Sequence, residues 1–349
     1  MIGHTKAAAG TAGLIKAALA LHHKVLPPTL KADPPDPQLE IDRSPFYLNT
    51  RSRPWLPDAD TPRRAGVSSF GFGGSNFHVV LEEVAAEKTD IAWDASVQIF
   101  ALSADTPADL MQQLQVLMED HRRNDGIPNR TVMAARTRNR FSHRHRYRLL
   151  WVDDNTGTVS DRFDDISKRA RALLEADLDK DAADPPDAPL YFGQLSPPGE
   201  IAFLFPGQGS QYPGMGRDLA CSFPDALHLF AEADRFLEAS PGLKDVLFPA
   251  DTGAEDRLKA ELAHTALAQP AIGSFSLAML KILAYFGVKP DAVCGHSFGE
   301  LTALRAAGWL DDDAFLKLSV LRGRLMSDAA EDPAFGRGGM LAVKASWEN

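Results

Sequence analysis

The sequence predicts an α/β protein, and three stretches carry that prediction. Residues 292–294 form a short apolar run before a serine between glycines and then apolar residues at helical spacing, which is typical of a buried strand, a sharp turn and an amphipathic helix. Residues 201–205 form an apolar run that predicts a strand buried on both faces, before a glycine-rich loop. Residues 97–104 predict another strand, and residues 106–123 a capped helix with Leu110, Leu114 and Leu117 on its apolar side.

Composition and charge limit the kinds of partner. The 349 residues, 44% apolar and 24% charged, leave room for two or three domains. A net charge of -10 argues against nucleic acid or an anionic membrane as the main partner. Two cysteines are too few for a disulfide framework or a structural zinc site, so we expect a cytoplasmic protein without a metal. The apolar tract 271–288 contains Lys281 and favours a buried helix over a membrane span.

The serine between glycines is the first candidate catalytic residue. In Gly295-His296-Ser297-Phe298-Gly299, small residues on both sides would let the backbone turn sharply and keep the Ser297 hydroxyl exposed at a helix N-terminus. The partial positive charge of that helix end would favour a developing oxyanion. This pattern alone is equally compatible with a plain tight turn. His296 projects differently from its neighbour at such a turn, so we expect it to pack or hydrogen-bond locally.

The glycine-rich loop after residue 205 is the second candidate site. The glycines of this loop are Gly207, Gly209, Gly214 and Gly216. They leave several backbone N–H groups free to point at one spot. A phosphate-binding loop would need a GK[ST] ending, which is missing. An oxyanion hole with the backbone N–H of Gln208 as one donor fits as well.

A later helix, beginning at Asp311 to Asp313, places an arginine on its predicted apolar side. Arg322 completes that side, and an inward guanidinium needs an anion. The anion is either a buried carboxylate of the protein or one that a ligand brings, and the pattern favours neither. Arg324 lies one turn from Asp328, which predicts a solvated ion pair. The predicted apolar side consists of Phe315, Leu318, Leu325 and Ala329.

Other stretches carry weaker signals. His4 precedes an Ala/Leu-rich helical pattern, followed by an extended Pro-rich passage over 27–62. The glycines at 71, 73 and 74 do not match GxGxxG and no helical pattern follows, so a dinucleotide site is not expected. Arg144, Arg146 and Arg148 alternate with other residues, which predicts a strand with one charged face, turned toward a neighbouring domain rather than nucleic acid. Residues 161–179 predict an acidic helix, and residues 181–189 a linker.

Several motifs in fixed order resemble a known family. GQGSQ, AQPA, GHSFGE and LRGRLM resemble the first half of a malonyl-CoA:acyl carrier protein acyltransferase. IGHTKAAAGTAGLIK and PRRAGVSSFGFGGSNFHVVLEE resemble the closing part of a β-ketoacyl synthase, and the middle segment resembles the linker domain of type I polyketide synthases. The residues within these motifs are most similar to those of the iterative synthases of polyunsaturated fatty acids and their enediyne and glycolipid relatives. The resemblance divides the chain into 1–88, 89–195 and 196–349.

The resemblance also implies a fold and site residues. It implies an incomplete thiolase-like ketosynthase tail, a small α/β linker domain, and a partial acyltransferase with a hydrolase-like parallel sheet. Ser297 would be the nucleophile, the Gln208 backbone an oxyanion donor, and Arg322 the clamp for the malonyl carboxylate, with Gln269 and His296 also at the substrate. The general base would be a histidine beyond Asn349. His4 matches the ketosynthase GHT motif, and Phe70 and Phe72 match the loop that gates its pocket.

The same resemblance implies partners. These are malonyl-CoA and an acyl carrier protein with its phosphopantetheine; this chain itself would bind no cofactor, and the parent synthase would dimerise through the ketosynthase. Two alternatives remain at this point. One is a serine hydrolase or thioesterase that uses the same elbow with water as acceptor, and the other is a non-catalytic scaffold.

Overall fold

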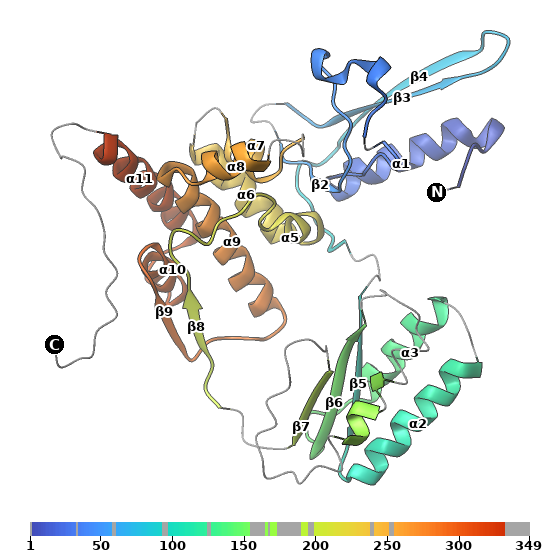
Figure 1. Cartoon of the computed structure of the whole chain (residues 1–349), viewed down its shortest axis with the longest axis vertical. Helices are drawn as coiled ribbons and strands as arrows, with labels where there is room; N and C mark the ends of the chain where they lie inside the picture. The colour runs from blue at the N-terminus through green and yellow to red at the C-terminus, as the bar shows by residue number, and fades with distance from the viewer. Residues whose placement is uncertain are drawn as a thin grey trace. The chain divides into compact units, whose positions relative to one another are not determined.

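The structure is a computed structural model of the chain. It describes residues 2–32, 34–57, 61–92, 97–123, 127–153, 165–166, 168–172, 190–194, 199–237, 241–250 and 255–331. The chain divides into two compact units, Met1–Ala92 with Glu200–Asn349, and Trp93–Gly199 (Figure 1). Of the predicted acidic helix 161–179, residues 165–166 and 168–172 are described and are helical, whereas the predicted linker 181–189 lies outside the described residues.

In its described residues, the unit Trp93–Gly199 has a three-stranded antiparallel sheet in the order β5-β6-β7, the helices α2 and α3, and the helical residues 165–166 and 168–172. The predicted strand and capped helix are confirmed: the Thr106 hydroxyl accepts a hydrogen bond from the Asp109 N–H at 3.1 Å, and the three predicted leucines are buried. Phe100 stacks on Trp151 within this core. Its elements are β5 (Gln98–Ala104), α2 (Pro107–Arg123), α3 (Ile127–Arg140), β6 (Tyr147–Asp153) and β7 (Leu190–Gln194).

The prediction that Arg144, Arg146 and Arg148 form one charged face of a strand is wrong. Strand β6 begins at Tyr147, so Arg144 and Arg146 precede it in a turn after α3. The Ser103 hydroxyl, which accepts a hydrogen bond from the Ser142 N–H at 2.8 Å, holds that turn against β5. Of the three arginines, Arg148 lies in the strand, and its guanidinium donates to the Gln194 carbonyl on β7 at 3.4 Å.

The first segment of the other unit packs a helix against a β-hairpin (Figure 1). Strands β3 and β4 pair antiparallel, and α1 lies on β3 through two glycines: a Cβ on Gly10 would meet the Ser69 side chain at 3.1 Å, and one on Gly13 the Val67 side chain at 3.2 Å. The elements are η1 (Lys6–Ala8), α1 (Ala9–His23), β1 (Val25–Leu26), η2 (Pro37–Leu39), η3 (Ile41–Arg43), β2 (Arg53–Pro54), β3 (Arg64–Phe70) and β4 (Asn76–Glu82).

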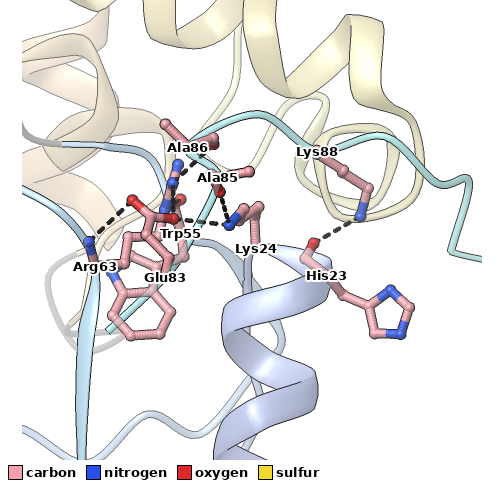
Figure 2. A network of polar contacts seen from close by, with 8 residues as sticks. All are labelled: His23, Lys24, Trp55, Arg63, Glu83, Ala85, Ala86 and Lys88. Carbon is pink, nitrogen blue, oxygen red and sulfur yellow. Dashed lines mark hydrogen bonds and ion pairs between the residues drawn. The ribbon is translucent and has the colours of Figure 1, made fainter. Parts of the chain in front are cut away.

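A buried cluster of charges ties this segment together, and Figure 2 shows it. The Glu83 carboxylate pairs with the Lys24 ammonium and the Arg63 guanidinium, each at 2.7 Å, and the three side chains are at most 4% exposed. Lys24 also donates to the Ala85 carbonyl, and Arg63 to the Trp55 carbonyl, each at 2.5 Å. The end of α1, the segment before β3 and the segment after β4 therefore meet at one carboxylate.

Lys88 connects the first segment to the rest of the unit. Its ammonium donates to the His23 carbonyl at the end of α1 at 2.7 Å (Figure 2). It also donates to the Cys221 carbonyl in α5 at 2.6 Å. Lys88 is 7% exposed, and burial lowers its pKa. Carbonyls in the last turn of a helix lack helical partners and carry partial negative charge, so one ammonium satisfies two helix ends.

The two cysteines of the chain differ in environment, which gives a simple test of this junction. Burial raises the pKa of the Cys221 thiol to about 12, whereas Cys294 is exposed. Because the thiolate is the reactive form, we expect iodoacetamide at about pH 8 to modify Cys294 and spare Cys221 in the folded protein. Peptide mass mapping measures both sites, with denatured protein as the control in which both react. Equal modification in the folded protein would contradict the burial of Cys221.

The remaining segment surrounds a long central helix, α9. A parallel pair, β8 and β9, precedes the glycine loop and the elbow, and the core lies mainly among α6, α7, α9 and α11 (Figure 1). The elements are β8 (Ala202–Phe205), α5 (Arg217–Ser222), α6 (Pro224–Leu237), α7 (Leu243–Leu247), α8 (Glu255–Leu262), α9 (Thr265–Tyr285), β9 (Ala292–Gly295), α10 (Phe298–Ala306) and α11 (Asp312–Glu331).

The prediction that both short strands are buried is wrong. In β8 Phe205 is 8% exposed but Leu204 is 76% exposed, and Cys294 in β9 is exposed as well. The reason is that the described sheet has two strands, with α10 packed against both. The apolar run did predict the strand itself correctly.

Helix α9 is the buried helix that the apolar tract predicts. By length and composition this helix could cross a membrane. However, 61% of its apolar 18-residue stretch is buried inside the structure. Lys281 near its end forms an ion pair with Asp312 of α11 at 2.7 Å. Burial on this scale is typical of the core helix of a globular unit.

Candidate functional site

The backbone at Ser297 has the geometry of a nucleophile elbow. Strand β9 ends at Gly295, Ser297 has φ 55° and ψ -115°, and α10 begins at the next residue. A positive φ is strained for a residue with a side chain, and such strain is held where the surroundings determine it. Ser297 is exposed, at the N-terminus of α10.

Two glycines make this turn possible. A Cβ on Gly295 would lie 2.0 Å from the Gly299 carbonyl oxygen, and a Cβ on Gly299 would lie 2.1 Å from the Phe205 carbonyl oxygen. No side chain fits at either position without moving backbone. The interpretation of the pattern as a plain tight turn is therefore the weaker one, because strand, strained serine and helix occur together.

The parallel pairing of β8 and β9 brings the glycine loop to the elbow. Phe205 pairs with Gly295, so both strands end at the same edge, and the His296 N–H donates to the Phe205 carbonyl at 3.1 Å. A Cβ on Gly207 would lie 2.7 Å from the His296 carbonyl oxygen and 3.1 Å from the Ser297 Cβ. The loop that carries Gln208 thus begins in contact with Ser297.

The prediction that the loop glycines all free their N–H groups is only partly right. The Gly209 N–H donates to the Gln211 side chain and the Gly214 N–H to the Leu247 carbonyl, each at 2.8 Å. By contrast, within the described ranges the backbone N–H of Gln208 has no hydrogen-bond partner, nor does that of Phe298. These two N–H groups come from the residue after Gly207 and the residue after Ser297. The Phe298 donor was not predicted, although its place directly after the serine could have indicated it.

His296 does not act on the serine in this structure. Its ring is exposed and lies against Gly207, where a Cβ would meet Nδ1 at 3.0 Å. In the part of the chain that the structure describes, the ring forms no hydrogen bond with the Ser297 hydroxyl. His296 contributes instead through its backbone, because its carbonyl accepts from the Gly299 N–H at 2.8 Å and closes the turn.

Arg322 lies on α11, and the apolar side predicted for that helix is right at Phe315 but wrong at its other three positions. Leu318 and Leu325 are 38% and 55% exposed, and Ala329 is exposed, while the buried positions are Phe315, Leu316, Ser319 and Gly323. Gly323 in this buried face packs closely on α9, because a Cβ on Gly323 would lie 2.8 Å from the Thr265 carbonyl oxygen. Arg322, the preceding residue, lies at the edge of the buried face and is half-buried.

The two arginines of LRGRLM differ in exposure. For described residues the structure records no ion pair of Arg322 with any carboxylate, so the protein carboxylate allowed by the sequence is not found there. The predicted ion pair between Arg324 and Asp328 is also wrong, since both side chains point into solvent and no contact joins them in the described part of α11.

Thr265, the first residue of α9, connects Arg322 to the glycine loop. The Gln208 side chain donates to the Thr265 hydroxyl at 3.1 Å, and Gly323, next to Arg322, packs on the Thr265 carbonyl. Thr265 is therefore contacted both by the Gln208 side chain and by Gly323, the residue after Arg322. Gln269, one turn further along α9, is fully buried, and its Nε2 lies 3.4 Å from the Met326 sulfur of α11. Its Oε1 has no hydrogen-bond partner among described residues.

The candidate residues of the N-terminal segment form a separate group. Gly10 of α1 lies against Ser69 and Gly13 lies against Val67, so α1 runs antiparallel to β3. The start of α1 therefore points toward the hairpin tip. Phe70 and Phe72 at that tip are 75% and 109% exposed, and His4 is also exposed. No described contact joins His4 to Ser297. Among the residues searched, those of the described ranges, no group of three His, Cys, Asp or Glu side chains could hold a metal ion.

Family models match three parts of the chain. Residues 202–349 match the acyl transferase domain, residues 35–148 the ketoacyl-synthetase C-terminal extension, and residues 1–33 the C-terminal domain of β-ketoacyl synthase. The chain is 37% identical over 99% of its length to the spectinabilin polyketide synthase system protein NorB of Streptomyces orinoci. It is 36% identical over 99% to the mycoketide-CoA synthase of Mycobacterium tuberculosis. It spans 15% and 8% of those two relatives.

A solved structure supports the fold. The acyl transferase domain of ZmaA is 24% identical and superposes with a TM-score of 0.53, over 69% of this chain and 50% of that one. At this identity the match speaks for the fold alone. The narrower likeness to iterative synthases stays a prediction, as do the boundaries 1–88, 89–195 and 196–349.

Proposed function

We propose, from the premise that this chain joins the end of a ketosynthase to an acyltransferase domain of the type I polyketide synthases, that Ser297 carries a malonyl-type extender unit from coenzyme A to an acyl carrier protein. The acyltransferase class itself follows from the family. The substrate, the acceptor and the roles of individual residues are the proposal. The observation that carries it is Arg322: a half-buried arginine without a described carboxylate partner, next in sequence to Gly323, which packs on the same Thr265 that the Gln208 side chain contacts.

The reaction takes place in two transfers at Ser297. In the first, the Ser297 oxygen attacks the thioester carbonyl of malonyl-CoA while a base takes its proton, and coenzyme A leaves as the thiol. In the second, the phosphopantetheine thiol of the carrier protein attacks the serine ester and Ser297 recovers its proton. We propose that the base is a histidine beyond residue 349, because His296 does not bond to Ser297.

Each tetrahedral intermediate places a negative charge on the former carbonyl oxygen. The backbone N–H groups of Gln208 and Phe298 have no described partner and flank the nucleophile, so they are the donors we assign to that oxygen. Loss of one such donor typically costs about 10² to 10³ in rate. The Gln208 side chain, bonded to Thr265, would keep the first donor in place.

Arg322 supplies selectivity for a carboxylated acyl group. A planar guanidinium can bind the free malonyl carboxylate with two parallel charge-assisted hydrogen bonds. We keep Gln269 as a residue of the substrate pocket that acts through α11, since its side chain contacts Met326 of that helix rather than solvent. His4, Phe70 and Phe72 would serve the ketosynthase, which would use the transferred unit in a condensation.

The serine ester itself is the first testable prediction of this mechanism. Ser297→Ala should form no covalent adduct with malonyl-CoA, because the attacking oxygen is gone. Intact-protein mass spectrometry of the full synthase, with Cys294→Ala as the matched control for an exposed nucleophile, measures this adduct. A persistent malonyl adduct in the unchanged protein supports a transferase, whereas rapid release of free malonate without carrier protein would favour the hydrolase. An adduct on the Ser297→Ala variant would contradict the assignment.

Partners and location complete the proposal. The carrier protein brings phosphopantetheine, and the parent synthase forms a homodimer through its ketosynthase in the cytoplasm. These statements rest on the family and on the motifs of the sequence. The scaffold alternative is less favoured, because the strained serine and its unpartnered N–H donors have no use in a purely structural domain.

A further inference from the structure

A small cavity lies where the segment around β2 meets the turn before α5. Its volume is about 110 Å³, smaller than the roughly 300 Å³ or more of pockets that take drug-sized ligands. Three arginines line it, Arg51, Arg53 and Arg217, and its lining includes no acidic side chain of a described residue. The other walls include Pro213, Gly214 and the end of α7.

Arg53 is the unusual member of this cavity. Its guanidinium stacks on the Tyr47 ring at 5.2 Å, and its Nε and Nη1 are enclosed without a hydrogen-bond partner in the described structure. Nη2 is the remaining nitrogen through which Arg53 can meet a ligand. A partly buried guanidinium without an anion is costly, and the stacked ring offsets only part of that cost.

The other two arginines leave the cavity positively charged. Arg51 is exposed and forms no described ion pair. Arg217 is paired with Asp218 at 3.4 Å, but that carboxylate is 89% exposed and such pairs are weak. The backbone around the cavity is fixed, because the Asn49 side chain donates to the carbonyls of Leu26 and Pro27 at 3.0 and 2.9 Å. A cavity of this size and charge, on a fixed backbone, suits one small oxyanion.

We infer that this cavity binds a phosphate group, held mainly by Arg53 with help from Arg51 and Arg217. Arginine is suited to this ligand, because its charged N–H groups form strong charge-assisted hydrogen bonds with phosphate oxygens, here through Nη2 of Arg53. The group can be inorganic phosphate or the terminal phosphate of an ester whose remainder lies outside the cavity. Bound phosphate would join the β2 segment to the turn at Gly214, five residues after Gly209 in the loop that also carries Gln208.

The test measures thermal stability of the full protein against phosphate concentration, with chloride at equal ionic strength as the reference. A ligand that binds the folded state raises the melting temperature in a saturable way. Phosphate also stabilises proteins by exclusion from their surface, but that effect does not saturate and acts on variants alike. We expect a saturable rise in the unchanged protein, about tenfold weaker apparent affinity or more in Arg51→Gln, and no saturable rise in Arg53→Met.

Two controls make the result specific. Arg324→Gln removes an exposed arginine of α11, outside the cavity, and should keep the saturable rise. Adenosine 3′-phosphate distinguishes the source: if it competes with inorganic phosphate, the site accepts a phosphate ester, and if it does not, the ligand is the free ion. If Arg53→Met fails to fold, Arg51→Gln decides, because its side chain is exposed. A rise that is linear, or equal in all variants, would overturn the inference.

Discussion

Replacing Arg322 with alanine is expected to lower the rate of malonyl loading onto Ser297 by about 10²-fold or more, and to leave loading of an uncharged acetyl group close to that of the unchanged protein. Charge-assisted hydrogen bonds contribute about 1.5–3 kcal/mol each, and about 1.4 kcal/mol corresponds to a factor of ten. Removing both bonds to the malonyl carboxylate therefore affects the carboxylated substrate alone. The kcat/KM values for malonyl-CoA and acetyl-CoA in the full synthase measure this difference.

Arg324→Ala is the matched control, because this arginine lies two residues away on the same helix but is exposed and unpaired in the described structure. It should change neither rate. Arg322→Lys keeps the charge but cannot form the two parallel bonds, so it should recover only part of the malonyl rate. Equal losses with both substrates would show that Arg322 supports the fold or the nucleophile rather than the carboxylate.

Replacing Glu83 with glutamine is expected to lower the free energy of unfolding by about 3–5 kcal/mol, the cost typical of leaving a buried charge without its partner. Glutamine has nearly the same shape, so packing is preserved while Lys24 and Arg63, 4% and 2% exposed, lose their shared carboxylate. Urea unfolding of the two proteins measures the difference. The large effect arises because one carboxylate compensates two buried cations.

Glu82 provides the control for this substitution. It is the neighbouring residue and pairs with Arg64 at 2.7 Å, but both side chains are more than half exposed. Glu82→Gln should therefore change the free energy of unfolding by at most about 1 kcal/mol. A similar loss in both variants would mean that the buried cluster has no special role.

The same carboxylate gives this cluster a defined pH dependence. Burial alone would raise the pKa of Glu83, but the hydrogen bonds from the Arg63 backbone and from the Lys24 and Arg63 side chains outweigh it, and the pKa lies below its usual 4.5. Above that pH the carboxylate is ionised in both states and its contribution is complete. Below it the unfolded chain binds the proton first, so stability falls with pH until the folded carboxylate is protonated. In Glu83→Gln this part of the acid dependence should disappear.

Local motifs predicted the backbone of the elbow better than they predicted which residues around it are buried. Glycine, serine and glycine at fixed spacing require the same backbone turn in any context, and the structure confirms the strand, the strained serine and the helix. Helical period, in contrast, predicted that Leu318 and Leu325 would be buried, and both are exposed. Periodicity shows which residues share a face, but only the neighbouring helix decides which face is covered.

Contacts between distant segments were outside the reach of the sequence. Glu83 meets Lys24 and Arg63 from positions 59 and 20 residues away, and nothing in their local patterns indicates a shared site. Helix α3 was not predicted, because arginines at its end obscure its few apolar positions. The cavity at Arg53 likewise forms between segments more than 150 residues apart.

The sequence by itself predicted Ser297 as the nucleophile, the glycine loop and Arg322 as site residues, and it indicated the family to which these motifs point. Each of these depends on residue types at short, fixed spacing, which the backbone translates directly into local geometry. Only the tertiary structure decided that the Phe298 N–H has no described partner, that Gln208 and Gly323 both contact Thr265, and that Arg322 lacks a described protein carboxylate. Those facts depend on parallel pairing of β8 with β9 and on the close approach of Gly323 to α9, which no single segment encodes.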